Sequence, residues 1–133
     1  GVNWADQGAI SDNFAGFRPS VVLDNGTYRM WFSQKVSSGS NVGYATSSDG
    51  INWSAYNQSL TTCFFCITTE NIIPVLAVGG DGAWDRPAVG DVWVIKDTNF
   101  KMWYTGGEVI TPNNGGPESV EYVEGAIGYA TSQ

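Results

Sequence analysis

The side chains best suited to binding a ligand are two arginines and two tryptophans. Arg18 and Arg86 each stand directly before a proline, in Arg18-Pro-Ser-Val and Arg86-Pro-Ala-Val. A guanidinium presents a planar set of donors that matches carboxylates, phosphates and sugar hydroxyls. Trp84 and Trp93 are indoles of the kind that stacks on sugar rings. These four residues are the candidate ligand-binding set, although an ion pair or loop contact for the arginines and core packing for the tryptophans are the structural alternatives.

The chain contains no histidine, which removes the commonest general base and the commonest metal ligand. Two cysteines lie together as Cys63-Phe-Phe-Cys66. One such pair does not complete a four-ligand zinc site, and the surrounding sequence lacks the strand–helix pattern of a redox motif. A loop disulfide or two half-buried thiols is therefore the favoured interpretation, and we expect neither a metal nor a cofactor.

Charge excludes several partners. The net charge is −7, from 13 acidic and 6 basic residues, so nucleic acid and anionic membrane surfaces are poor candidates. No apolar stretch approaches the roughly 18–20 residues of a membrane-spanning helix. The first residues show no basic and apolar leader pattern, so we expect no signal peptide in this chain. The start at Gly1 without Met is compatible with the removal of an export signal, and a secreted or periplasmic location is slightly favoured.

The elements that must position the candidate residues are revealed by an internal repeat. Three motifs recur in the same order, and an insertion lengthens the second copy at about 106–125. The first copy contains Arg18-Pro-Ser-Val, Tyr28-Arg-Met-Trp-Phe-Ser and Val42-Gly-Tyr-Ala-Thr-Ser, and the second contains Arg86-Pro-Ala-Val, Phe100-Lys-Met-Trp-Tyr-Thr and Ile127-Gly-Tyr-Ala-Thr-Ser. Repeated short units of this kind indicate a repeat architecture.

Each motif has the composition of a strand. Asp24-Asn25-Gly26 is a hairpin signal, and Asp49-Gly50 predicts a turn in which the carboxylate caps backbone groups. Four antiparallel strands that occur twice predict an all-β protein, a β-propeller with two four-stranded antiparallel blades per chain. The first repeat covers about 11–60, and the second covers about 80–133 plus 1–10, so the N-terminal strand around Trp4 would complete the last blade. Trp31 and Trp103 should pack between blades, and Trp4 and Trp53 should be packed as well.

Two blades are too few to close a ring, since propellers use about four to eight. The chain therefore belongs to a longer propeller, or copies of it self-associate into a closed ring. A dimer would give four blades and a trimer six, and we favour the trimer.

The repeated motifs, together with Ser48-Asp-Gly-Ile-Asn-Trp53, resemble the blade repeat of the five-bladed propeller glycosidases, the clan of arabinanases, xylosidases, levansucrases and invertases. The resemblance covers nearly the whole chain. It implies catalysis by channel-facing carboxylates: an Asp as base or nucleophile, a second Asp that tunes it, and a Glu as acid.

The position that often holds the Asp in this clan, directly before the proline, is arginine in both copies here. Asp85 is the nearest carboxylate and Glu108 is the candidate acid. A turn-capping role for Asp85 and a solvated loop position for Glu108 are the alternatives.

Three functions remain open. A carbohydrate-recognising propeller module, lectin-like or glycosidase-like without catalysis, is the leading hypothesis. A glycoside hydrolase that uses Asp85 and Glu108 is the second. A structural or protein-interaction propeller is the third.

Overall fold

A computed structural model gives the fold of the chain and describes residues 3–10, 16–36, 39–56, 72–107, 109–110, 121–122 and 125–133. These residues form strands, turns and loops, and no helix occurs among them. The prediction of an all-β protein is confirmed.

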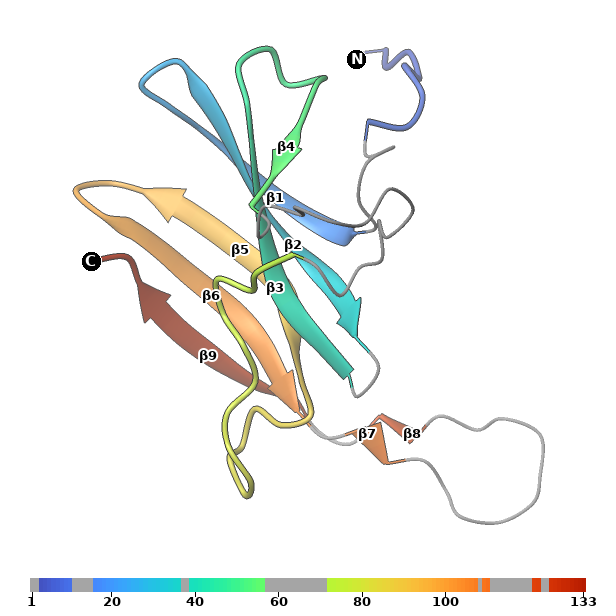
Figure 1. The fold of residues 1–133 in the computed structure, drawn as a ribbon, viewed down its shortest axis with the longest axis vertical. Helices are drawn as coiled ribbons and strands as arrows, with labels where there is room; N and C mark the ends of the chain where they lie inside the picture. The colour runs from blue at the N-terminus through green and yellow to red at the C-terminus, as the bar shows by residue number, and fades with distance from the viewer. Residues whose placement is uncertain are drawn as a thin grey trace, which may run out of the picture.

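The first unit is an antiparallel set of strands in which each strand pairs with the next along the chain (Figure 1). Its strands are β1 (Phe17–Asp24), β2 (Thr27–Val36), β3 (Gly39–Ser47) and β4 (Ser54–Ala55). Asn25 and Gly26 both have positive φ, of 50° and 76°, as a tight hairpin between β1 and β2 requires. The hairpin predicted from Asp24-Asn25-Gly26 is confirmed.

The second unit repeats three of these strands. They are β5 (Ala88–Lys96), β6 (Phe100–Gly107) and β9 (Ala126–Thr131), with a short hairpin of β7 (Val109–Ile110) and β8 (Glu121–Tyr122) between β6 and β9. The pairs β5–β6 and β6–β9 are antiparallel. The strands therefore fall on the repeated sequence motifs, with β7 and β8 in the insertion.

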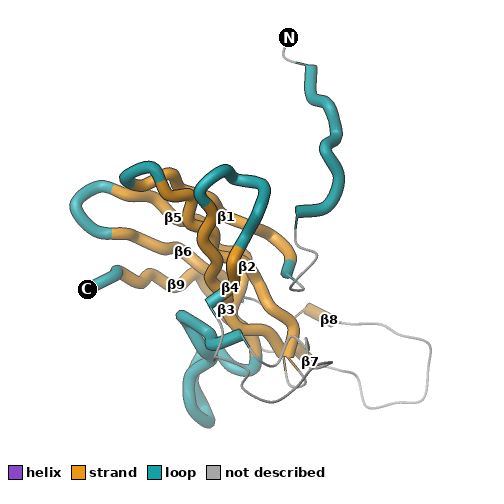
Figure 2. Tube along the Cα trace, turned by 45° about the horizontal axis from the view of Figure 1, so that its top comes forward, coloured by secondary structure: helices purple, strands orange, loops and turns teal. Residues whose placement is uncertain are grey.

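The N-terminal segment differs from the prediction. Residues 3–10 form no strand, and Trp4 is exposed. Figures 1 and 2 both place this segment away from β9, which is the last strand in the order of the sheet. Residues 3–10 therefore do not pair with β9 of their own chain, and the fourth strand expected from them in the second unit is not formed.

The two units join through very little backbone. The sheet has the order β1-β2-β3-β5-β6-β9, and the step from β3 to β5 is a single parallel pair, Ser40 with Ala88. The sheet is open rather than closed into a barrel. Each unit's first strand carries a β-bulge, in β1 between Phe17 and Ser20 and in β5 between Gly90 and Trp93.

Side chains hold the units together where the backbone does not. Successive residues of a strand point to opposite faces, so β2 contributes to two cores. The core between the units contains Trp31, Val42, Val89, Val92, Val94 and Tyr104. The other face of the first unit contains Met30, Phe32, Ala45, Trp53 and Ile72. Trp31 and Trp53 are therefore buried, as the sequence predicts.

Serine side chains link the first unit to the backbone of β5. The hydroxyls of Ser20 and Ser33 accept hydrogen bonds from the N–H groups of Val94 and Asp91, both at 2.9 Å. The hydroxyl of Ser40 donates to the carbonyl oxygen of Val89, also at 2.9 Å. These bonds satisfy backbone groups that strand pairing leaves free, which fixes the position of β5 over the first unit.

The turn after β3 is built around the Asp49 carboxylate, as predicted. Its Oδ1 accepts from the backbone N–H groups of Ile51 and Asn52 at 2.8 and 2.7 Å, and its Oδ2 accepts from the Asn52 side-chain amide at 2.7 Å. Gly50 supplies a φ of 77°. The Asn52 side chain, followed by the two backbone donors, holds the pKa of Asp49 well below its usual range.

This lowered pKa predicts an acid-dependent loss of stability. A carboxyl whose pKa is depressed by folding contributes stability above its unfolded pKa of about 3.9, and that contribution is lost as the pH falls further. The thermal midpoint of the wild-type protein should therefore fall from about pH 4 downwards, and Asp49→Asn should show a shallower fall. Asp6→Asn, outside the sheet, is the matched control. An unchanged pH profile for Asp49→Asn would contradict the assignment.

Candidate ligand-binding site

Most of the candidate residues gather at one end of the sheet. We call this the strand-start end, where β1, β3, β5 and β9 begin and β2 and β6 finish. It carries Arg18 at the beginning of β1 and the loop that contains Trp84, Asp85 and Arg86, just before β5. Convergence of polar and aromatic groups is the usual mark of a binding site.

Arg18 forms an ion pair with Asp91, from Nη1 to Oδ1, across the two units. Both side chains are partly exposed. Each residue has a positive φ, 54° for Arg18 and 50° for Asp91, and each lies in the bulge of its strand. Non-glycine residues rarely adopt this conformation, and where they do the surrounding structure imposes it, often at functional sites. An exposed ion pair adds little to the stability of the folded protein. The main effect of the pair is therefore to orient the Arg18 guanidinium and the Asp91 carboxylate.

Asp91 and its pairing with Arg18 were not predicted from the sequence. An ion pair or a loop contact was the structural alternative for Arg18, and the structure gives an ion pair with Asp91. The available signal was a carboxylate inside the apolar run from Val89 to Ile95. An acidic residue there interrupts the alternation of a strand, which is what a bulge does.

Trp84 is the most ligand-like aromatic group at this end. Its ring stacks on Tyr104, with centroids 5.8 Å apart and planes 29° apart, while 50% of the residue stays exposed. Gly106 and Gly128 make room for it, because a Cβ at either position would lie 2.8 or 2.7 Å from a Trp84 ring carbon. The indole is thus held in place with part of its surface open to solvent.

Asp85 has a structural contact as well as an accessible position. Its Oδ1 accepts a hydrogen bond from the Gly79 N–H at 3.2 Å, which closes the loop before β5. Burial, with a smaller contribution from the Asp85 carboxylate, raises the pKa of the neighbouring Tyr104. Asp85 therefore has the turn-capping role that was the structural alternative for it. The same carboxylate directly follows Trp84 in the chain.

Arg86 pairs with Asp81 inside the same loop, not with Asp85. Arg18 and Arg86 occupy equivalent places in the repeat but have different partners, one across the units and one local. They therefore do not act as two copies of one site.

The remaining candidates lie elsewhere. Trp93 is on the exposed face of the second unit, directly opposite Trp103 in the neighbouring strand, and not at the strand-start end. Glu108, Cys63 and Cys66 lie outside the described residues. Among the described residues no group of three or more potential ligands could hold a metal ion, and no helix is long and apolar enough to cross a membrane.

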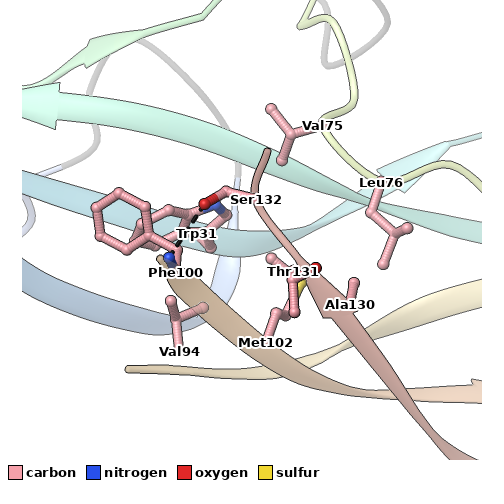
Figure 3. A pocket seen from close by; sticks show the side chains of 9 residues that line it. All are labelled: Trp31, Val75, Leu76, Val94, Phe100, Met102, Ala130, Thr131 and Ser132. Carbon is pink, nitrogen blue, oxygen red and sulfur yellow. Dashed lines mark hydrogen bonds between the residues drawn. The ribbon is translucent and has the colours of Figure 1, made fainter. Parts of the chain in front are cut away.

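A cavity of about 170 Å³ lies between the units near the opposite end of the sheet (Figure 3). Apolar side chains dominate its lining: Trp31, Val75, Leu76, Val94, Phe100, Met102 and Ala130, together with Thr131 and Ser132. The Ser132 hydroxyl already accepts a hydrogen bond from the Phe100 N–H at 3.0 Å. Few polar groups remain to orient a ligand, so the cavity is a packing gap between the two units.

Comparison with known proteins gives little functional information. No protein-family model matches the chain. Two uncharacterized proteins of Mycobacterium tuberculosis, from strains CDC 1551 / Oshkosh and H37Rv, are each 42% identical to it over 59 residues. The matched segment is 40% of this chain and 19% of each mycobacterial protein, so the chain spans about a fifth of the length of these relatives.

Proposed function

We propose that this chain is a carbohydrate-recognising module made of two β-propeller blades, with its ligand site at the strand-start end around Trp84. We also propose that the chain is related to the five-bladed propeller glycosidases, whose blade repeat its sequence motifs resemble. Ligand recognition, rather than hydrolysis, is the leading activity.

Two features support the blade architecture. Each unit is an antiparallel set of consecutive strands, and the units pack face to face through aromatic and aliphatic side chains rather than through a continuous ladder. Propellers repeat four-stranded antiparallel sheets around a central axis, and the first unit has four such strands.

The observation that carries the functional proposal is the half-exposed Trp84 ring fixed against Tyr104. A sugar ring offers an apolar C–H face with hydroxyls around its rim, so an aromatic platform bordered by charged groups matches it. Asp85 and Arg86 follow Trp84 directly in the chain and provide an acceptor and a donor.

Binding can be measured by isothermal titration with arabino-, xylo-, fructo- and gluco-oligosaccharides. At least one series should bind the wild-type protein, and Trp84→Ala should weaken its affinity by about tenfold, equivalent to about 1.4 kcal/mol. Trp4→Ala is the matched control, because Trp4 is exposed and lies outside the sheet. Equal affinities for Trp84→Ala and the wild-type protein would reject Trp84 as the platform.

Glycoside hydrolysis is the second candidate, favoured by the presence of Asp91 as another carboxylate at the same end as Asp85. Hydrolysis of a glycosidic bond requires two carboxyl groups across it. Turnover of aryl glycosides that Asp85→Asn abolishes would support this candidate. A protein with neither binding nor turnover would leave the structural or protein-interaction function.

A further inference from the structure

The second unit exposes an apolar face on the side away from the first unit. This outer face consists of Trp93, Ile95, Trp103, Ile127 and Tyr129, all exposed. Trp93, Trp103 and Tyr129 lie directly opposite one another across β5, β6 and β9, so their side chains share one face. Trp93 is 69% exposed. A contiguous apolar surface of this kind is typical of an interaction site.

The core between the units shows what covers the equivalent face of the first unit. Trp31 lies opposite Tyr44 there, with ring centroids 5.2 Å apart and planes 50° apart. Trp103 and Tyr129 of the outer face repeat this pair, at 5.3 Å and 46°. Trp31 is covered by the second unit, with the Phe100 ring centroid 5.0 Å from its own. Trp103 has the same local geometry without that cover.

The covering face also has a counterpart on the first unit. In the second unit, Val94 lies opposite Met102, and both pack into the core with Trp31. In the first unit, Val21 lies opposite Met30 in the same register, and Leu23 lies opposite Tyr28. Val94 is 5% exposed, but Val21 is 48% exposed. Leu23 is exposed as well. Met30 itself is buried in the first unit's own core, so the open part of this face is the β1 side with Val21 and Leu23. The chain thus has an uncovered counterpart of the Trp31 side of its internal interface and a partly uncovered counterpart of the Val94 side.

We propose that a second copy of this chain docks head to tail on the outer face. The exposed residues Val21 and Leu23 of the second copy, with the half-buried Tyr28 beside them, would lie over Trp103 and Tyr129, as Val94 and Phe100 lie over Trp31 within one chain. The contact joins two different surfaces, so it repeats from copy to copy and closes into a ring when the rotation allows. Each copy adds two units, and a trimer of six units is the expected ring.

Oligomer mass tests the contact independently of sugar binding, because Trp84 stacks on Tyr104, whose side chain lies on the opposite face of β6 from Trp103. Light scattering coupled to size-exclusion chromatography should show a mass of more than one chain for the wild-type protein. Trp93→Lys on the outer face and Leu23→Lys on the opposite face should each remove the assembly, since a charge would be buried in the contact. Trp4→Lys, at an exposed position outside the sheet, should not change the mass.

Mixing the two variants gives the sharpest result. Trp93→Lys keeps an intact Leu23 face and Leu23→Lys keeps an intact outer face, so equal amounts should form a dimer although each alone is a monomer. Loss of assembly with Trp93→Lys but not with Leu23→Lys would indicate two outer faces in contact and would overturn the head-to-tail arrangement. A wild-type monomer across the concentration series would overturn the proposal altogether. Ile127→Lys replaces Trp93→Lys if circular dichroism shows that the latter is unfolded.

Discussion

Replacing Trp31 with alanine is expected to lower the free energy of unfolding by about 3–5 kcal/mol. Trp31 is 8% exposed and its ring contacts Tyr44 within its own unit and Phe100 of the other unit. Removing it enlarges the cavity that already lies between the two units in this region. The surrounding strands are fixed by their ladders and cannot collapse to fill it, so most of the lost contact energy is not recovered.

Trp103→Ala is the matched control, because it is the same substitution at the equivalent place in the repeat. Trp103 is 36% exposed within one chain, so denaturant unfolding of dilute protein should show a much smaller loss than for Trp31→Ala. If copies assemble through the outer face, the loss for Trp103→Ala should grow with protein concentration. Equal losses for both variants in dilute solution would show that the buried position of Trp31 is wrong.

Gly39→Ala is expected to be comparably damaging, with a loss of about 3 kcal/mol or more, the upper end of the strain for one unfavourable backbone conformation. Gly39 begins β3 with a φ of 148°, which an L side chain rarely adopts. A Cβ at this position would lie 2.1 Å from the carbonyl oxygen of Pro87. A backbone oxygen cannot rotate away, so β3 and the loop before β5 would have to separate.

Two other glycines separate these causes. Gly26 has a positive φ but no atom near its missing Cβ, so Gly26→Ala should cost only the backbone strain. Gly80 has neither feature, so Gly80→Ala should leave the midpoint of thermal unfolding unchanged. Thermal unfolding should therefore rank the losses as Gly39, then Gly26, then Gly80. A Gly39→Ala variant as stable as Gly80→Ala would contradict the close approach of β3 to Pro87.

Local sequence patterns predicted the strands and their turns because these depend on residues close together in the chain. Asn25-Gly26 needs only its own backbone conformation, and Asp49 caps residues two and three positions later. The exposure of Trp103 was not predictable in this way. Its strand pattern matches that of Trp31, and only the arrangement of the units decides which tryptophan is covered.

The candidate site was predicted only in part, for a similar reason. Trp84, Asp85 and Arg86 do lie at the end of the sheet where β5 begins, but the partner of Arg18 is Asp91, 73 residues away. That contact depends on two bulges that place both residues in the left-handed backbone region. A single sequence shows a bulge only as an irregular alternation, so the pairing needed the fold.

The single backbone pair between Ser40 and Ala88 has a consequence for how such units are arranged on a curve. A continuous ladder would fix the angle between neighbouring sheets through the hydrogen bonds themselves. Here the angle is set mainly by the volumes of the side chains between them, such as Trp31, Val89 and Val92. A few substitutions there would change the curvature, and with it the number of units that fill a circle, while every strand kept its own pairing.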